Sequence, residues 1–229
     1  MVAVIGDIHG CFFTLVELVE LIWKNYPGVQ IYSVGDLVDR GKNSYETVEF
    51  IINEKIKFAP GNHDYMFAHF FKKPTSIFAR SWVFNGSEST LISYEKHEEA
   101  VFKHIEVIEK APLFYNLTDC FISHAGVSSY YRSVLPPDFR NNLDILKPYI
   151  EQDYPEDHGV MWNRSRLLDL GKLQVVGHTK QKDVRYDKKA NSLYIDTGAY
   201  ACRKLSAVVI ENSKVVDKFG VKTNMNDLR

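Results

Sequence analysis

The feature that most constrains the fold is a short unit of strand, glycine-bounded loop and helix that recurs along the first third of the chain. In each copy an apolar, largely β-branched run is followed by glycine and polar residues, and then by apolar residues at helical spacing. The three copies cover residues 2–23, 29–54 and, more weakly, 57–71. Strands that alternate with helices in this way predict an α/β core.

The second half of the chain changes to strand-like runs. Short apolar segments bounded by turn residues predict strands over residues 114–117, 120–123, 173–176, 193–195, 205–210 and 215–219. Between the two halves, residues 65–111 are mostly helical by pattern and are a candidate cap. The proline-containing stretch 132–162 is a candidate substrate-facing excursion. No linker divides the chain, so we expect a single catalytic domain over residues 1–229.

Composition excludes several classes of protein. The formal net charge is −1, with acidic and basic residues mixed, so the sequence lacks the basic footprint of a nucleic-acid or membrane-surface protein. No apolar run reaches the length of a membrane span, and the apolar start is too short for a signal peptide. The three cysteines do not form a disulfide framework. We expect a cytoplasmic monomer.

Metal-capable side chains follow the predicted strands. Asp7 and His9 come after the first strand, Asp36 after the second, and Asn62 and His63 after the third. Residues two apart in an extended segment point the same way, so Asp7 and His9 can reach one ion. The carboxyl ends of neighbouring strands in an open α/β sheet meet at one crevice. We therefore expect these side chains to lie close together.

Two histidines in the second half, His124 and His178, also follow predicted strands. The candidate ligands are then all oxygen or nitrogen donors: Asp7, His9, Asp36, Asn62, His124 and His178. A set without thiolates suits manganese, iron or zinc. There are too many ligands for one ion, and a bridging carboxylate such as Asp36 favours two ions about 3.5 to 4 Å apart.

A structural explanation competes with this one. A single Gly-Asp after a strand is usually a turn, and a single buried histidine is usually a satisfied core residue. Turn chemistry does not explain why five loops, each after a predicted strand, all carry Asp, His or Asn beside glycine. Taken together, the loops favour a metal site.

The same loops carry a family resemblance. In order along the chain they are Gly-Asp-x-His-Gly, Gly-Asp-x-Val-Asp-Arg-Gly, Gly-Asn-His-Asp, His-Ala-Gly and Gly-His-Thr. This ordered series resembles the bacterial branch of the phosphoprotein phosphatases, within the metallophosphoesterase superfamily. The match runs from Gly6 to Gly198. It implies a calcineurin-like fold, with a central β-sandwich flanked by helices and the metal site at the top of the sheets.

The resemblance also implies roles for the site residues. One ion would be held by Asp7, His9 and Asp36, and the second by Asp36, Asn62, His124 and His178. Manganese is favoured, with iron or zinc as alternatives, and a water between the ions would be the nucleophile.

The remaining implied roles concern proton transfer and phosphate binding. His63 would be the general acid, with its ring oriented by Asp39. Arg40, Arg164 and Asn62 would bind the phosphate oxygens.

Three functions are compatible with these motifs. The leading one is a protein phosphatase acting on phosphoserine and phosphothreonine, with phosphotyrosine as an additional candidate substrate and a phosphorylated protein as partner. The alternative is a bis(5′-nucleosyl)-tetraphosphatase. In members that cleave symmetrically an alanine typically stands where this chain has Asp39, whereas asymmetric cleavers are harder to exclude. The third is a scaffold that has lost catalysis, which should show damage at His63, Asp39 or a bridging ligand, and none is visible.

Overall fold

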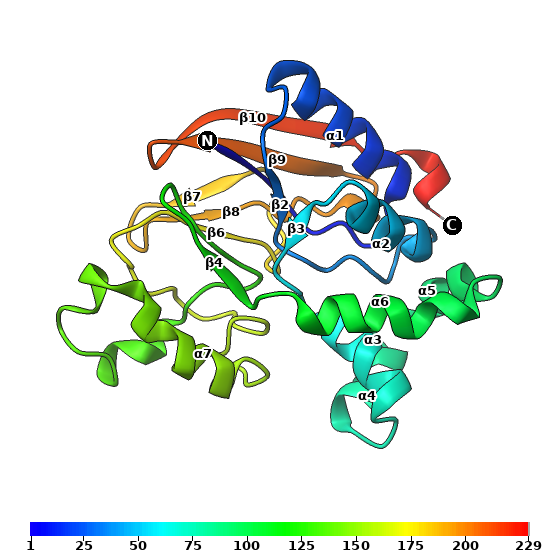
Figure 1. The fold of residues 1–229 in the computed structure, drawn as a ribbon, viewed down its shortest axis with the longest axis horizontal. Helices are drawn as coiled ribbons and strands as arrows, with labels where there is room; N and C mark the ends of the chain where they lie inside the picture. The colour runs from blue at the N-terminus through cyan, green and yellow to red at the C-terminus, as the bar shows by residue number, and fades with distance from the viewer. Residues whose placement is uncertain (229) are drawn as a thin grey trace.

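The protein is built on two five-stranded mixed sheets, seen in a computed structural model that describes residues 1–228 (Figure 1). The first sheet has the order β10-β9-β1-β2-β3 and comprises β1 (Val2–Ile5), β2 (Ile31–Ser33), β3 (Lys57–Phe58), β9 (Lys204–Glu211) and β10 (Lys214–Lys222). Strands β1, β2 and β3 are parallel, and β9 is antiparallel to both of its neighbours.

The second sheet has the order β4-β5-β6-β8-β7. Its strands are β4 (Phe114–Asn116), β5 (Phe121–Ser123), β6 (Gln174–Val176), β7 (Arg185–Asp187) and β8 (Ser192–Tyr194). Strands β5, β6 and β8 are parallel, and the outer strands β4 and β7 are antiparallel to them. Both sheets therefore carry a parallel centre whose carboxyl ends hold the loops of interest.

Alternation along the strands explains how the two sheets pack. On β1, Val4 lies in an apolar cluster with Ile122 of β5 and Val175 of β6, whereas Ala3 and Ile5 belong to the cluster beneath the helices. Successive side chains of a strand point to opposite faces, so β1 contributes to both cores. The result is a β-sandwich with an apolar layer between the sheets.

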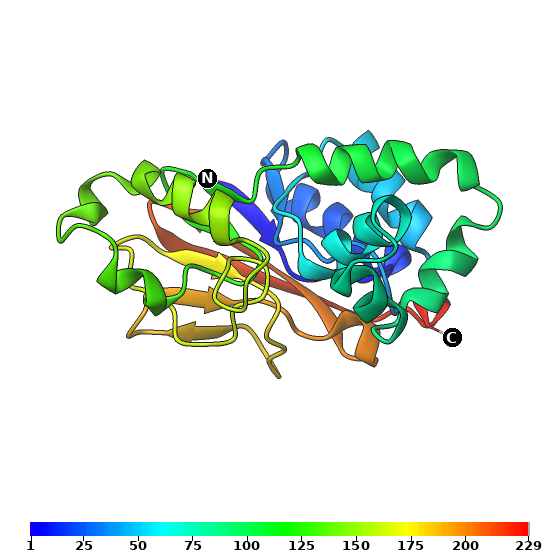
Figure 2. The ribbon, with the colours of Figure 1, turned by 90° about the horizontal axis from the view of Figure 1, so that it is seen from below.

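Helices cover the outer faces of this sandwich. On the side of the first sheet lie α1 (Phe12–Asn25), α2 (Ser44–Asn53), α3 (Asn62–Lys72), α4 (Ile77–Val83), α5 (Ser87–Tyr94) and α6 (Val101–Lys110), which share one apolar cluster with that sheet. Within this layer α4 and α6 pack against α3, and α5 packs against α2. The second sheet packs against α7 (Lys147–Asp153) and neighbouring 3₁₀ turns. Figure 1 shows α1 and α7 on opposite sides of the molecule, and Figure 2 shows α1 to α6 gathered together. The α/β sandwich flanked by helices is thus confirmed.

The helical region 65–111 is part of the main core. Phe67, Trp82, Tyr94 and Ile105 are all buried in the cluster that also contains Ile5. The predicted excursion over residues 132–162 likewise buries apolar side chains on the outer face of the second sheet. Both regions therefore help to build the fold, and the patterns had not indicated how much of them would be buried.

Strand β7 was not predicted from the sequence. β7 has the sequence Arg185-Tyr186-Asp187 and lies at the edge of the second sheet with its first two residues exposed. It has no apolar run to mark it, because an edge strand in solvent needs none. Among residues 1–228, no helix is long and apolar enough to cross a membrane.

Candidate metal centre

The loops that follow the parallel strands bring the predicted ligands together. Asp7 and His9 follow β1, Asp36 follows β2, Asn62 begins α3 after β3, and His124 and His178 follow β5 and β6. All six side chains are buried, with His178 the most accessible at 7% exposure. Ligands from both sheets therefore meet at one edge of the sandwich.

Asp36 lies between the two sets of ligands. Its Oδ2 is 3.4 Å from Nε2 of His9 and 3.6 Å from Nε2 of His124. Two groups of potential ligand atoms lie close together. One comes from Asp7, Asp36 and His124, and the other from His9, Asp36 and His63. Asp36 is common to both groups, as a bridging carboxylate requires.

The side facing the second sheet is equally compact. Oδ1 of Asn62 is 3.1 Å from Nε2 of His124 and 2.9 Å from Nδ1 of His178. The backbone N–H of His178 donates to the Asp7 carboxylate, at 3.0 Å from Oδ2. The loop after β6 is therefore connected directly to the loop after β1.

Hydrogen bonds to the backbone fix the orientation of two imidazoles. Nδ1 of His9 donates to the carbonyl of Val38 at 2.9 Å, and Nδ1 of His124 donates to the carbonyl of Val34 at 2.8 Å. Each ring then presents an Nε2 lone pair toward the site. Partners of this kind typically set the tautomer and direction of metal-binding histidines.

The donor set fits divalent cations electrostatically. Burial raises the pKa of Asp7, and the neighbouring Asp196 and Asp36 carboxylates raise it further. Burial lowers the pKa of His9 and of His124, which keeps both imidazoles neutral. Neutral imidazoles and carboxylates are the donors that divalent cations bind, and bound ions would add positive charge to that of Arg40, which already lies beside His9.

The backbone of these loops is strained. His9, Asp36, Asp39, Arg40 and His178 all have positive φ, between 51° and 74°. Non-glycine residues rarely adopt this region, and such strain concentrates at functional sites. These residue types alone do not predict the strain, which follows from the turns that aim the side chains.

Two glycines make room for the carboxylates. A Cβ at Gly61 would overlap Oδ1 of Asp36, and a Cβ at Gly177 would overlap Oδ1 of Asp7. The glycines of the Gly-Asn-His and Gly-His-Thr motifs are therefore explained by close approach to the two carboxylates.

His63 and Asp39 form a buried pair beside these ligands. Nδ1 of His63 lies 2.6 Å from Oδ2 of Asp39. The indole N–H of Trp82 on α4 donates to both carboxylate oxygens of Asp39, at 3.0 and 2.8 Å, and the Thr90 hydroxyl on α5 donates to Oδ1 at 2.7 Å. Trp82 and Thr90 belong to no motif, and sequence reasoning did not find them.

Arg40 bridges the two histidines on the open side of the site. Its guanidinium donates to Nε2 of His9 at 2.7 Å and to Nε2 of His63 at 2.8 Å. Arg164 is exposed. The pKa of His178 is lowered to about 2, mainly by burial, next by the neighbouring His124 and then by the charge of Arg164. Arg40 thus contacts the site directly, whereas Arg164 acts on His178 through its charge.

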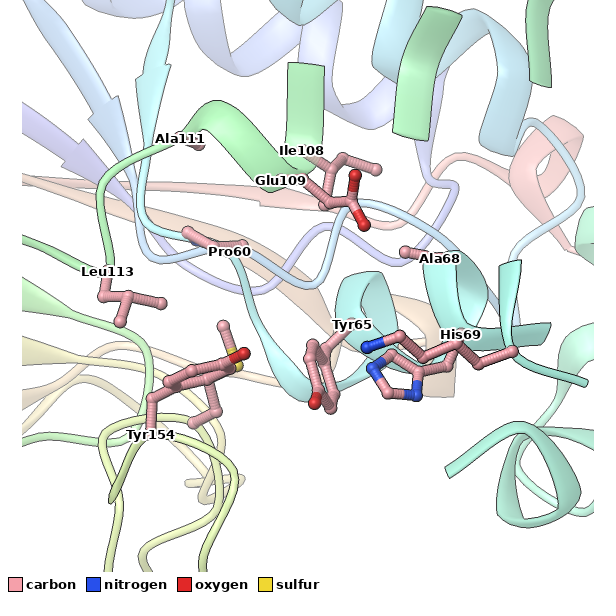
Figure 3. Close-up of a pocket in the computed structure, with 11 residues that line it drawn as sticks. Pro60, Tyr65, Ala68, His69, Ile108, Glu109, Ala111, Leu113 and Tyr154 are labelled. Carbon is pink, nitrogen blue, oxygen red and sulfur yellow. The ribbon is translucent and has the colours of Figure 1, made fainter. Parts of the chain in front are cut away.

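An open pocket of about 290 Å³ lies near the start of α3. Tyr65 and His69 of α3 line it together with Tyr154 and Glu109 (Figure 3). None of the candidate ligands, nor His63, Asp39 or Arg40, lines this pocket.

Comparison with known proteins identifies the family. Residues 1–209 match the calcineurin-like phosphoesterase family. The chain is 29% identical to the asymmetrical bis(5′-nucleosyl)-tetraphosphatase PrpE of Anoxybacillus flavithermus, over 90% of this chain and 88% of the relative. It is 27% identical to the protein of the same name from Bacillus cereus strain Q1, over 93% of this chain and 92% of that relative.

Solved structures agree on the fold. A putative diadenosine tetraphosphatase superposes with a TM-score of 0.60 at 19% identity, covering 96% of this chain and 92% of that one. A cold-active protein-tyrosine phosphatase from a psychrophilic Shewanella superposes with a TM-score of 0.64 at 17% identity, covering 97% and 80%. With ordered motifs, a sandwich fold and a nitrogen and oxygen donor site in place, the chain belongs to the calcineurin-like phosphoesterase family and is a metal-dependent phosphoester hydrolase.

Proposed function

We propose that the protein hydrolyses dinucleoside polyphosphates asymmetrically, so that diadenosine tetraphosphate yields ATP and AMP. The observation that carries this proposal is the similarity, over nine-tenths of the chain, to relatives named as asymmetrical bis(5′-nucleosyl)-tetraphosphatases. This substrate was the alternative interpretation of the sequence, and the comparisons favour it over a protein substrate. Asp39, in the position where symmetric cleavers typically have alanine, is consistent with asymmetric cleavage.

Two divalent ions, with manganese favoured and iron or zinc as alternatives, would be held by the six ligands described above. By the family resemblance, Asp7, His9 and Asp36 would hold one ion, and Asp36, Asn62, His124 and His178 the other. In the structure, Asp7 is grouped with Asp36 and His124, and His9 with Asp36 and His63. When bound, the ions would supply Lewis-acid polarisation of the phosphoryl oxygens and an activated water.

The residues of the chain provide orientation and the proton. Arg40, Arg164 and Asn62 bind oxygens of the reacting phosphate, which requires the Arg40 guanidinium to move off the two imidazoles. A water oxygen would bond to phosphorus and release its proton to solvent as the phosphoanhydride P–O bond breaks. Once Arg40 has moved, Nε2 of His63 is free to take up a proton. The imidazolium, held by Asp39 through Nδ1, then donates that proton to the departing phosphate oxygen.

The test compares substrates and products. We would measure kcat/KM on diadenosine tetraphosphate and on a panel of phosphoserine and phosphothreonine peptides, using manganese-loaded protein, and separate the nucleotide products by chromatography. We expect the dinucleotide to be preferred and to give ATP with AMP. Two molecules of ADP would show symmetric cleavage, and a preference for peptides by orders of magnitude would contradict the proposal.

A second candidate is the protein phosphatase that the motifs first indicated. The observation that favours it is the buried His63–Asp39 pair with its two further donors, because a well-oriented general acid matters most when the leaving group is a poor one such as a serine alkoxide. The peptide arm of the same experiment tests this candidate.

A further inference from the structure

A tyrosine ring extends the metal centre toward a second group of cations. The Tyr200 ring packs edge-on against the His9 imidazole, with centroids 4.9 Å apart. The guanidinium carbon of Arg40 lies 4.3 Å from the Tyr200 ring centroid. The Lys180 ammonium lies 5.3 Å from the same centroid and 3.5 Å from the Tyr200 hydroxyl. Arg40 and Lys180 therefore contact one ring, and Tyr200 connects Lys180 to the metal centre.

Arg203 lies beside Lys180. A Cβ placed on Gly198 would be 2.8 Å from Cδ of Lys180 and 3.4 Å from Cδ of Arg203, so the two stems pack over this turn. Nη1 of Arg203 donates to the carbonyl of Gln181 at 3.2 Å, which holds the guanidinium near the loop after β6. The loop after β6 and the turn after β8 thus place two cations together.

The charges of Lys180 and Arg203 are not neutralised. Both side chains are exposed, and within residues 1–228 neither forms an ion pair with a carboxylate. Lys204, by contrast, is paired with Asp183 at 2.9 Å. In a chain with a net charge of −1, unpaired cations next to the site create a local attraction for an anion.

We infer that Lys180 and Arg203 form a subsite for the distal phosphates of a linear phosphoanhydride chain whose reacting phosphate is bound by Arg40. A phosphoserine ester has one phosphate and would leave this subsite empty. A polyphosphate chain carries charge on every phosphate, and charge-assisted hydrogen bonds from Lys and Arg suit those oxygens. The inference rests on the proposed function, since it names the part of the substrate that this side of the site recognises.

The test uses inorganic probes, so that it does not depend on turnover of a dinucleotide. We would measure the inhibition constants of tripolyphosphate and of orthophosphate against p-nitrophenyl phosphate hydrolysis, with the free manganese concentration held constant. Wild type is compared with Lys180→Gln, Arg203→Gln and the double variant. Lys188→Gln, which removes an exposed cation in the turn between β7 and β8, is the control.

We expect wild type to bind tripolyphosphate more tightly than orthophosphate. Each subsite variant should weaken tripolyphosphate about tenfold relative to orthophosphate, because it removes a charge-assisted hydrogen bond to a distal phosphate; tenfold corresponds to about 1.4 kcal/mol. Lys188→Gln should change neither constant. If the ratio of the two constants in the double variant stays within about twofold of wild type, the subsite is wrong. If the double variant loses the preference for tripolyphosphate over orthophosphate but the wild type does not cleave diadenosine tetraphosphate, the subsite stands and the proposed function fails.

Discussion

At the scale of single residues, the importance of His63 is expected to differ between phosphoserine and diadenosine tetraphosphate, because their leaving groups differ. An alkoxide departing from phosphoserine is a strong base and needs a proton as it leaves. The phosphate departing from a phosphoanhydride is stable as an anion, because phosphate esters have a second pKa of about 6. A general acid at His63 therefore matters more for hydrolysis of phosphoserine than for hydrolysis of a phosphoanhydride.

We predict that His63→Ala lowers kcat on an alkyl phosphate by about two orders of magnitude or more and lowers kcat on diadenosine tetraphosphate much less. Metal content, measured by elemental analysis, should stay at the wild-type level. Equal losses on both substrates would show that His63 does more than donate a proton. Normal turnover of the alkyl phosphate would remove its assignment as the general acid.

Among the elements, α4 and α5 act on the site through Asp39. Trp82 and Thr90 are buried in these helices and donate three hydrogen bonds to the Asp39 carboxylate. Asp39 in turn orients His63, so the helical region 65–111 contributes to the predicted proton transfer without contacting a substrate. Trp82 and Thr90 are positioning residues in this scheme.

We predict that Trp82→Phe lowers kcat on an alkyl phosphate by at least about tenfold with little change in KM, because a hydrogen bond to a charged group contributes about 1.5–3 kcal/mol. Thr90→Val should act in the same direction, and Thr90→Ser should preserve activity. Trp23→Phe is the matched control, since Trp23 donates to the carbonyl of Val29 away from the site. An equal effect of Trp23→Phe would mean that the loss is merely structural.

The loop after β6 gives a second prediction at this scale. In Gly177→Ala the new methyl overlaps the Asp7 carboxylate, which must move. We expect reduced metal content by elemental analysis and a matching loss of activity. Gly220→Ala in β10 is the control, because its Cβ would meet the flexible side chain of Lys204. Full metal occupancy in Gly177→Ala would show that Asp7 is not a ligand or tolerates displacement.

In the molecule as a whole, the end of the described chain caps the first helix. Helix α1 has Cys11 at its N-cap position and no side-chain cap of its own. Asp227 is fully buried and accepts from the backbone N–H groups of Phe13 and Thr14, both at 2.9 Å. It also accepts from the Thr14 hydroxyl at 2.6 Å and the Asn43 amide at 2.9 Å. A contact across more than two hundred residues thus secures the helix that follows the first metal loop.

We predict that Asp227→Ala lowers the free energy of unfolding by about 2 kcal/mol, because it removes a helix cap and leaves buried donors without acceptors. The expected fall in Tm is about 4–8 °C for a domain of this size. Asn226→Ala, next to it in the chain but exposed, should leave Tm unchanged. An unchanged Tm for Asp227→Ala would show that solvent replaces the cap.

Much of the fold was predictable because its signals are local. The apolar period of residues 12–23 predicted α1, and the run over 205–210 predicted most of β9. Edge strand β7 was missed because its stability depends on pairing with β8 and not on apolar side chains. The burial of α4 and α5 was missed for a related reason, since α4 packs against α3 and α5 packs against α2, and no local pattern marks such contacts between helices.

The sequence by itself determined the residue types of the site, their order along the chain and their position after strands, and these were enough to indicate a phosphoester hydrolase. Only the tertiary structure decided which distant side chains lie around them: Trp82 and Thr90 at Asp39, Asp227 at α1, and Lys180 beside both Tyr200 and Arg203. The physical reason is that motifs are encoded in contiguous residues. Hydrogen bonds and cation clusters depend on which surfaces the folded sheets bring into contact.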